Sequence, residues 1–197
     1  MSMFRFAAAA AIAFGLIAPV MAQDKLERLG IPGPIIFEGT KFELAWTSHP
    51  APTYYKQEYV PAGQVVESYD EMFMVDLLTE GQDPESAAAT MISGLDERKA
   101  GGDPMVNYDM ISNEATGELI LDFLLSDTSS GQIIVEWNAY RYSPTADGAG
   151  VTLFAISRRG YGEDGATQFL ERLTTWRQTS IQELAVMELP PVTVAAE

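Results

Sequence analysis

The sequence predicts an α+β fold, a mainly antiparallel sheet of about six to seven strands flanked by two long helices in an α/β/α sandwich. Apolar residues alternate along residues 118–126 and again along 132–140, which is typical of strands with one buried face. The run 151–158 is apolar at almost every position, so we expect a central strand covered on both faces. Residues 83–100 and 166–187 have the apolar spacing of helices.

Residues 1–22 are expected to be a secretory signal peptide. Arg5 supplies the positive start, an apolar run follows, and Val20-Met21-Ala22 places small residues before a cleavage site at Gln23. The alternative is an uncleaved anchor, but the apolar run is shorter than the roughly 20 residues that a membrane span needs. We therefore expect a single α+β domain, 23–197, that is periplasmic or secreted and does not span a membrane after signal cleavage.

The first part of this domain is expected to contain two strands joined by a turn. Residues 23–39 read as a lead-in with one short helical turn at 24–29. Alternating apolar residues predict strands at 41–48 and 54–60, and the proline-rich segment 49–53 predicts the turn between them.

The segment 65–79 is ambiguous between helix and strand. Ser68 and Glu71 have the spacing of a capping box, so a helix through Leu78 is one interpretation. The apolar residues that follow lack a helical stripe, and we favour one helical turn at 68–71 followed by a strand at 72–79.

The two expected helices carry end signals of different strength. In the first, Asp83 is the expected N-cap and Gly101-Gly102 ends the helix. A strand at 105–112 then leads into the central meander, and the second helix ends before Pro190-Pro191. We expect one shared interior, made by apolar residues of the meander and of the second helix: Leu119, Phe123, Val135, Trp137, Phe169 and Leu173.

The element order β-β-β-α-β-β-β-β-α resembles that of the PsbP-like fold, which occurs in extrinsic photosystem II subunits and in a nuclear Ran-binding protein. The resemblance covers most of the mature chain and rests on element order. It implies an α/β/α scaffold used for binding or assembly. The segment 59–75, YVPAGQVVESYDEMFMV, also resembles small exported proteobacterial proteins of unassigned function.

The charge of the chain argues against several partners. Removal of residues 1–22 takes away Arg5 and no acid, which leaves 11 basic against 28 acidic residues and a formal charge of −17. Nucleic acids and anionic membrane surfaces require clustered positive charge, so neither is an expected partner. The chain has no cysteine, and its stability must come from a packed core.

The segment from Gly160 to Gly165 matches G-x-G-x-x-G between a predicted strand and a predicted helix. In a dinucleotide-binding fold, such glycines let a pyrophosphate approach the helix start. Here Glu163 and Asp164 would repel phosphate, and no strand follows the helix. We interpret the segment as a turn that needs the backbone freedom of glycine, and we expect no cofactor.

Signatures of catalytic and metal sites are weak. His49 is the only histidine, is expected in an exposed loop, and has no G-x-S-x-G nucleophile to serve. One histidine without cysteine does not make a zinc site. Two alternatives stay open: a pair of carboxylates among the 28 acids that acts as acid and base, and a calcium site at the loops around Asp147 or Glu163-Asp164.

Five arginines form the candidate ligand site: Arg141, Arg158, Arg159, Arg172 and Arg177. They lie near the last strand and the last helix of the prediction, where they would form an anion patch. The alternative, which we favour, is that they form salt bridges within an acidic protein.

These observations predict an exported, non-catalytic accessory or binding protein, with a possible protein partner in the cell envelope. One alternative is a carboxylate-based periplasmic hydrolase, which requires two acids converging in a pocket, one of them buried. The other is a structural subunit of an envelope assembly, which requires an exposed apolar patch.

Overall fold

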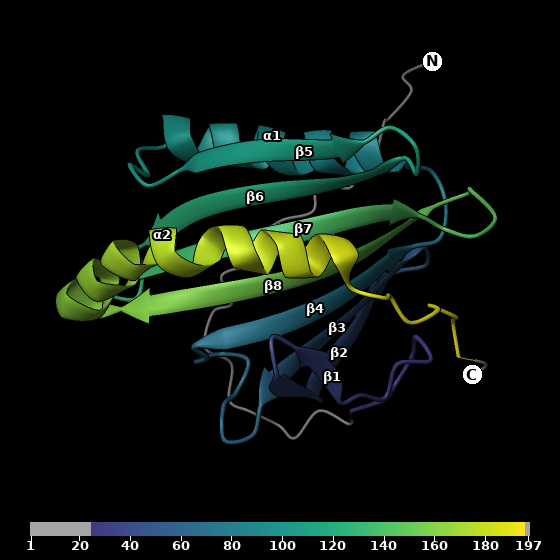
Figure 1. Ribbon diagram of the computed structural model, residues 1–197, viewed down its shortest axis with the longest axis horizontal. Helices are drawn as coiled ribbons and strands as arrows, with labels where there is room; N and C mark the ends of the chain where they lie inside the picture. Colours follow the sequence, from purple (N-terminus) through teal and green to yellow (C-terminus); the bar gives the residue numbers. More distant parts are fainter. Residues whose placement is uncertain (1–24, 196–197) are drawn as a thin grey trace, which may run out of the picture.

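The computed structural model describes residues 25–195, and the predicted signal peptide, 1–22, lies outside the described residues. Eight antiparallel strands form one curled sheet in the order β1-β2-β3-β4-β8-β7-β6-β5 (Figure 1). The strands are β1 Ile35–Phe37, β2 Thr40–Ala51, β3 Tyr54–Pro61, β4 Glu71–Leu78, β5 Asn107–Asn113, β6 Glu118–Asp127, β7 Ile134–Pro144 and β8 Val151–Tyr161. The helices are α1 Pro84–Ala100 and α2 Gly162–Val186.

The predicted fold class, a sandwich of six to seven strands between two long helices, is wrong. The eight-stranded sheet makes up most of the structure, and only α2, with 25 residues, is long; α1 has 17. The extra strand is β1, where three residues pair with β2. Strands of up to 12 residues make the sheet large enough to curl.

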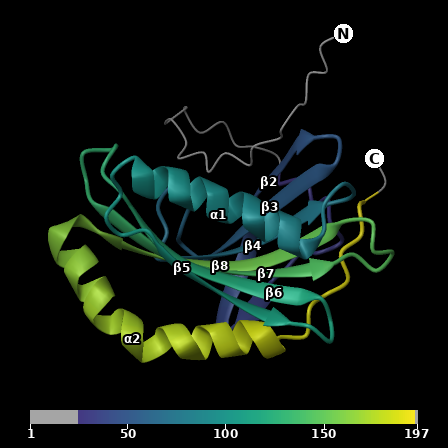
Figure 2. The ribbon, with the colours of Figure 1, turned by 90° about the horizontal axis from the view of Figure 1, so that it is seen from above.

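A local end signal explains where α1 begins, whereas α2 begins without a side-chain cap. The Asp83 carboxylate accepts a hydrogen bond of 2.7 Å from the backbone N–H of Ser86, so the predicted N-cap of α1 is confirmed. Helix α2 begins directly after β8, four residues before the predicted start at 166. Figure 2 shows the helices on opposite sides of the sheet, with α1 against β6 and β7 and α2 against β6, β7 and β8.

The prediction of one shared interior is wrong, because the sheet has a core on each face. Trp137, Phe169 and Leu173 belong to the core beneath α2, whereas Leu119 and Phe123 belong to the core beneath α1. Phe123 pairs in register with Asn138, so its neighbour Trp137 points to the other face.

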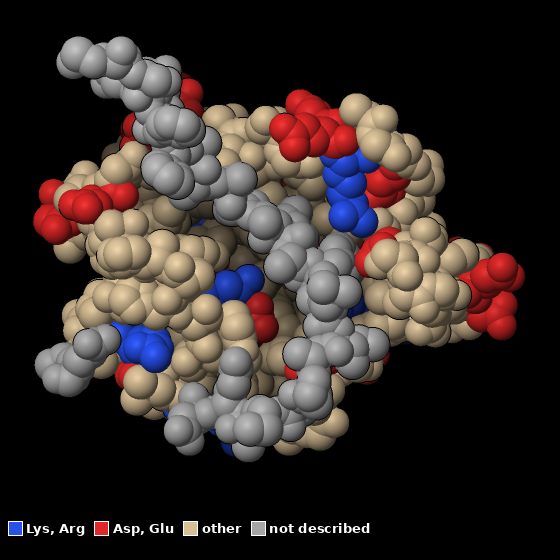
Figure 3. Space-filling view, turned by 180° about the vertical axis from the view of Figure 1, so that it is seen from behind, with Lys and Arg blue, Asp and Glu red and all other residues tan. Residues whose placement is uncertain are grey.

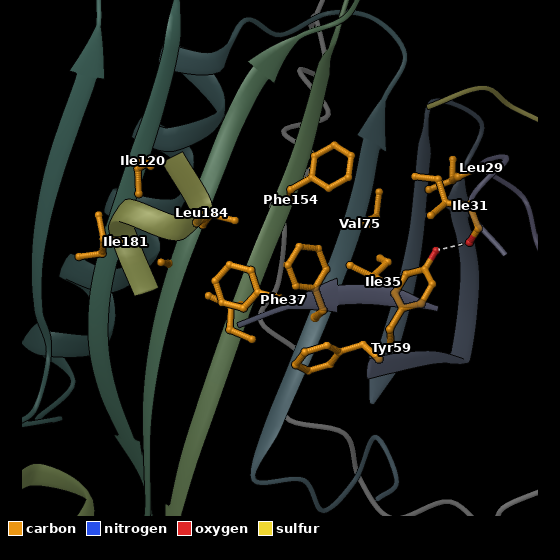
Figure 4. Packing of buried hydrophobic residues seen from close by; sticks show 14 of the residues in the cluster. Leu29, Ile31, Ile35, Phe37, Tyr59, Val75, Ile120, Phe154, Ile181 and Leu184 are labelled. Atoms are coloured by element: carbon orange, nitrogen blue, oxygen red, sulfur yellow. Dashed lines mark hydrogen bonds between the residues drawn. The ribbon is translucent and has the colours of Figure 1, made fainter. Parts of the chain in front are cut away.

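The α2-side core extends into the N-terminal segment, as Figure 4 shows. Leu29 and Ile31 pack beside Tyr59 of β3, and the Tyr59 hydroxyl donates a hydrogen bond of 2.6 Å to the Ile31 carbonyl oxygen. This bond satisfies two buried polar groups and fixes the lead-in segment to the sheet.

The predicted strands are mostly confirmed, and the exceptions lie in the N-terminal half. Strand β8 is central and buried on both faces, as predicted. Strand β2 continues through part of the expected turn at 49–53, with a register irregularity between Ser48 and Ala51 that accommodates Pro50. No helix forms at 68–71, where Val65 and Ser68 instead pair across a turn, and residues 25–29 are not helical.

Candidate functional site

Three of the five candidate arginines meet in one pocket of about 690 Å³, called the arginine pocket below. It lies where β8 passes into α2. Its walls are Arg158, Arg159, Gly160 and Tyr161 from β8, Gly165, Gln168, Phe169, Arg172 and Trp176 from α2, Glu38 from the turn between β1 and β2, and Asp70 and Glu71 from the start of β4.

Arg158 is the most engaged of these arginines. Its guanidinium donates hydrogen bonds to Ser180 at 2.6 Å and to Glu38 at 2.5 Å, and it reaches Glu71 at 3.5 Å. It also lies 4.8 Å from the ring centre of Trp176, a cation–π distance. Arg158 is therefore neutralised by its neighbours and fixes the floor of the pocket.

Arg159 and Arg172 differ in their surroundings. Arg159 binds the Glu136 carboxylate and lies 4.0 Å from the ring centre of Tyr69. The Arg172 side chain is exposed and forms no ion pair with any residue between 25 and 195. Among the three arginines that line the pocket, Arg172 is therefore the one whose charge is not neutralised by a described acidic residue.

Arg141 and Arg177 lie outside the arginine pocket. Arg141 binds Glu118 and lines a second pocket of about 530 Å³ at the far end of α2. Arg177 binds Asp122, which also accepts a hydrogen bond from the Trp137 indole. The five predicted residues therefore do not form one patch, and four of them form salt bridges.

The glycine motif is a packing device. A Cβ atom on Gly160 would lie 2.6 Å from the Phe169 Cβ and 2.8 Å from the Gly165 carbonyl oxygen. Gly162 has a φ of 70°, a conformation that side chains disfavour. These two positions let α2 turn back tightly onto the sheet, as expected for a turn.

His49 is not in an exposed loop, and that prediction is wrong. It lies in β2, is half-buried, and its ring stacks on Tyr55 with 4.0 Å between ring centres. Its buried Nε2 atom has no hydrogen-bond partner among the described residues.

A second set of polar side chains lies on the α1 side of the sheet. We call it the inner polar cluster, and its members are Tyr54, Lys56, Glu58, Asp76, Glu136 and Tyr140. Lys56 and Asp76 are cross-strand partners in β3 and β4, and Lys56 forms an ion pair with Glu58 at 3.1 Å. The Tyr54 hydroxyl donates a hydrogen bond of 2.6 Å to one Asp76 oxygen.

Burial shapes the electrostatics of this cluster. Burial raises the pKa of Asp76, and the charge of Glu58 adds to this, against the opposing effects of Lys56 and Tyr54. Burial also raises the pKa of Tyr140, and the carboxylates of Glu136, Asp76 and Glu58 raise it further. The negative charges of Glu58, Asp76 and Glu136 therefore all affect the surroundings of Tyr140.

Sequence reasoning missed this cluster because each acid was one among 28. A usable signal existed: Asp76 interrupts the apolar run of β4, and Glu136 interrupts that of β7. Charged residues in strands that are buried on both faces are rare without a partner or a role.

The inner polar cluster meets part of the requirement for the hydrolase alternative, because Asp76 is buried and acts electrostatically with Glu58. Lys56 and Tyr54 already occupy positions beside these acids. Within residues 25–195, no group of three or more histidine or acidic side chains is arranged to hold a metal ion. Asp147 binds Thr145 and the Ala149 backbone within its own loop.

Comparisons with known proteins give a family and nothing more specific. A family model matches residues 29–189. Neither a curated protein nor a solved structure matches the chain. In the part of the chain that the structure describes, neither helix has the length and apolar character needed to span a membrane.

Proposed function

We propose that this chain, which belongs to the uncharacterised family matched over residues 29–189, is an exported, non-catalytic binding protein whose ligand site is the arginine pocket. Export is inferred from residues 1–22, which have the pattern of a signal peptide. The predicted element order resembles that of the PsbP-like fold, which favours a role in binding or assembly, although β1 adds a strand to that order.

The observation that carries the proposal is the position of Arg172. It lines a pocket with two aromatic neighbours, Phe169 and Trp176, and has no ion-pair partner among residues 25–195. A guanidinium beside aromatic surface offers an anion both charge and apolar contact. The ligand we infer is a small organic anion with one carboxylate-like group and an apolar body.

The other charges of the pocket limit that anion to a low charge. Arg158 and Arg159 are paired with acids, and Glu38, Asp70 and Glu71 line the same pocket. A dianion would meet repulsion from these carboxylates and from the acidic protein as a whole. A monoanion needs only the charge of Arg172.

Binding is tested by titrating the purified protein with benzoate and hexanoate while following tryptophan fluorescence, since Trp176 lines the pocket. Arg172→Gln should weaken binding about tenfold, the loss expected for one charged hydrogen bond. Lys99→Gln, an exposed change of the same charge in α1, is the control. Equal affinities of the two variants would argue against the arginine pocket as the site.

Export is tested separately by cell fractionation and by sequencing the N-terminus of the processed protein. We expect Gln23 as the first residue of periplasmic or secreted material. A protein that retains residues 1–22 and stays with the membrane would support the uncleaved anchor instead.

A structural role in an envelope assembly is the second candidate, and strand β5 favours it. Strand β5 forms one edge of the sheet, and its Met110 and Ile111 side chains are 45% and 46% exposed. Open strand edges accept strands from partners. Native electrophoresis of envelope extracts tests this: Met110→Lys with Ile111→Lys should release the protein from any complex.

A further inference from the structure

The inner polar cluster contains a buried oxygen that lacks a partner. Asp76 is 6% exposed, and its Oδ2 atom accepts the hydrogen bond from Tyr54. Its Oδ1 atom is buried and accepts no hydrogen bond from any described residue. A buried acceptor without a donor costs free energy, so this atom is suited to a donor that a ligand would supply.

The charges around this oxygen favour a cation. Lys56 is the cross-strand partner of Asp76 and binds Glu58, and Arg159 binds Glu136. The cluster therefore holds three carboxylates and two basic groups. Burial raises the pKa of Tyr140, and these three carboxylates raise it further. A positive group beside Tyr140 and Asp76 would therefore be stabilised.

Aromatic rings border the same region. Tyr140 packs edge-on against Phe123 with 4.9 Å between ring centres and lies 6.4 Å from Tyr142. The Tyr140 hydroxyl makes no hydrogen bond with residues 25–195, so its oxygen is also available to a donor. Carboxylates combined with aromatic rings are the groups that recognise ammonium ions.

This region is open to solvent at its margin. The side chains of Lys56 and Glu58 are 27% and 16% exposed. Helix α1 contacts β6 and β7, and β2 and β3 rise beside it in Figure 2. Figure 3 looks onto this side and shows a basic and an acidic group close together near the middle of a largely uncharged surface.

We propose that the inner polar cluster is a binding site for a small organic cation, whose ammonium group donates to Asp76 Oδ1 and lies against Tyr140. This site goes beyond the proposed function, because it lies on the other face of the sheet and takes a ligand of opposite charge. The two sites share the Arg159–Glu136 ion pair, but they are tested with different ligands and different variants, so failure of one is distinguishable from failure of the other.

The test is isothermal titration of the purified protein with n-butylammonium, with n-butanol as the uncharged analogue. We expect binding of the ammonium with a Kd of about 1 mM or below and none of the alcohol. Asp76→Asn should weaken binding at least about tenfold. Glu114→Gln removes one charge from an exposed turn and should leave affinity unchanged.

Tyr140→Phe gives an independent readout if Asp76→Asn fails to fold, as judged by circular dichroism. It removes only the hydroxyl oxygen and should weaken ammonium binding several-fold. Three results would overturn the proposal: no heat of binding with the ammonium, equal binding of the alcohol, or wild-type affinity in both variants. The first would mean that Asp76 Oδ1 does not accept a hydrogen bond from an ammonium ligand.

Discussion

The guanidinium of Arg141 donates a hydrogen bond of 2.8 Å to the carboxylate of Glu118, which lies on the neighbouring strand. The same guanidinium donates to the carbonyl oxygens of Leu184 and Met187, each at 2.9 Å, at the end of α2. Helix α2 has no basic residue in its last turn, so a strand residue supplies the positive charge that a helix end favours.

Arg141→Met should destabilise the protein by about 2–3 kcal/mol, because it leaves carbonyl groups and a carboxylate without their charged donor. Urea denaturation followed by circular dichroism measures this loss. Arg172→Met, which removes an exposed arginine from the same helix–sheet layer, should change the free energy of unfolding by less than about 0.5 kcal/mol. Similar losses in both variants would contradict a capping role for Arg141.

Acid should destabilise the fold partly through Glu118. Burial raises the pKa of Glu118, but hydrogen bonds from Ser143 and Arg141 outweigh it and lower the pKa below its ordinary value of 4.5. The stabilisation is therefore present above that value and is lost as the pH falls through the lowered folded pKa. The Tm of Glu118→Gln should fall less between pH 5 and pH 3 than that of the wild type, by calorimetry.

Asp103 should contribute to the same acid transition. Burial raises its pKa, but hydrogen bonds from Ser126 and Arg98 lower it overall. A double variant, Glu118→Gln with Asp103→Asn, should show a flatter dependence of Tm on pH than either single variant. An unchanged pH dependence would mean that other carboxylates control acid unfolding.

Gly160→Ala should destabilise the protein by about 1–3 kcal/mol, the usual cost of forcing extra volume into a packed contact. The added methyl group would meet Phe169 and the Gly165 carbonyl oxygen. Gly165→Ala is the matched control, since a Cβ there meets nothing within 4 Å and the residue is helical. Alanine at 165 should be neutral or stabilise the helix by up to about 1 kcal/mol.

Asp122→Ala should cost about 2–4 kcal/mol, because Asp122 is 2% exposed and holds both Arg177 and the Trp137 indole. Removal leaves the buried indole N–H without an acceptor. Urea denaturation followed by tryptophan fluorescence measures the loss directly at the affected ring. Glu114→Ala, in an exposed turn, should have almost no effect.

Local sequence patterns predicted most strands and both helices, but they did not predict which face of each strand packs against α1 and which against α2. In β6, Leu119 and Phe123 face α1 while Ile120 and Leu124 face α2, so both faces of the strand are apolar. The alternation of apolar residues then no longer shows which face of β6 packs against which helix. A shift of one residue in strand pairing would place every side chain of the strand on the opposite face of the sheet. The prediction placed Trp137 beside Phe123 for this reason.

The candidate site was predictable only in part. Arg158, Arg159 and Arg172 are close in sequence and meet because β8 runs directly into α2. The inner polar cluster draws on β3, β4 and β7, and its members are too far apart in sequence for any spacing rule. Strand β1 escaped notice because three residues are too few for a periodic signal.

Strands β4 and β8 are the single adjacent pair in the sheet that are not neighbours in the chain sequence. Every other pairing joins consecutive strands, so β1–β4 and β5–β8 are two zigzag ribbons that meet along one seam. Each ribbon closes only short loops, whereas the seam must bring together segments about 80 residues apart. Folding speed should therefore be governed by how fast the two ribbons find each other along β4 and β8.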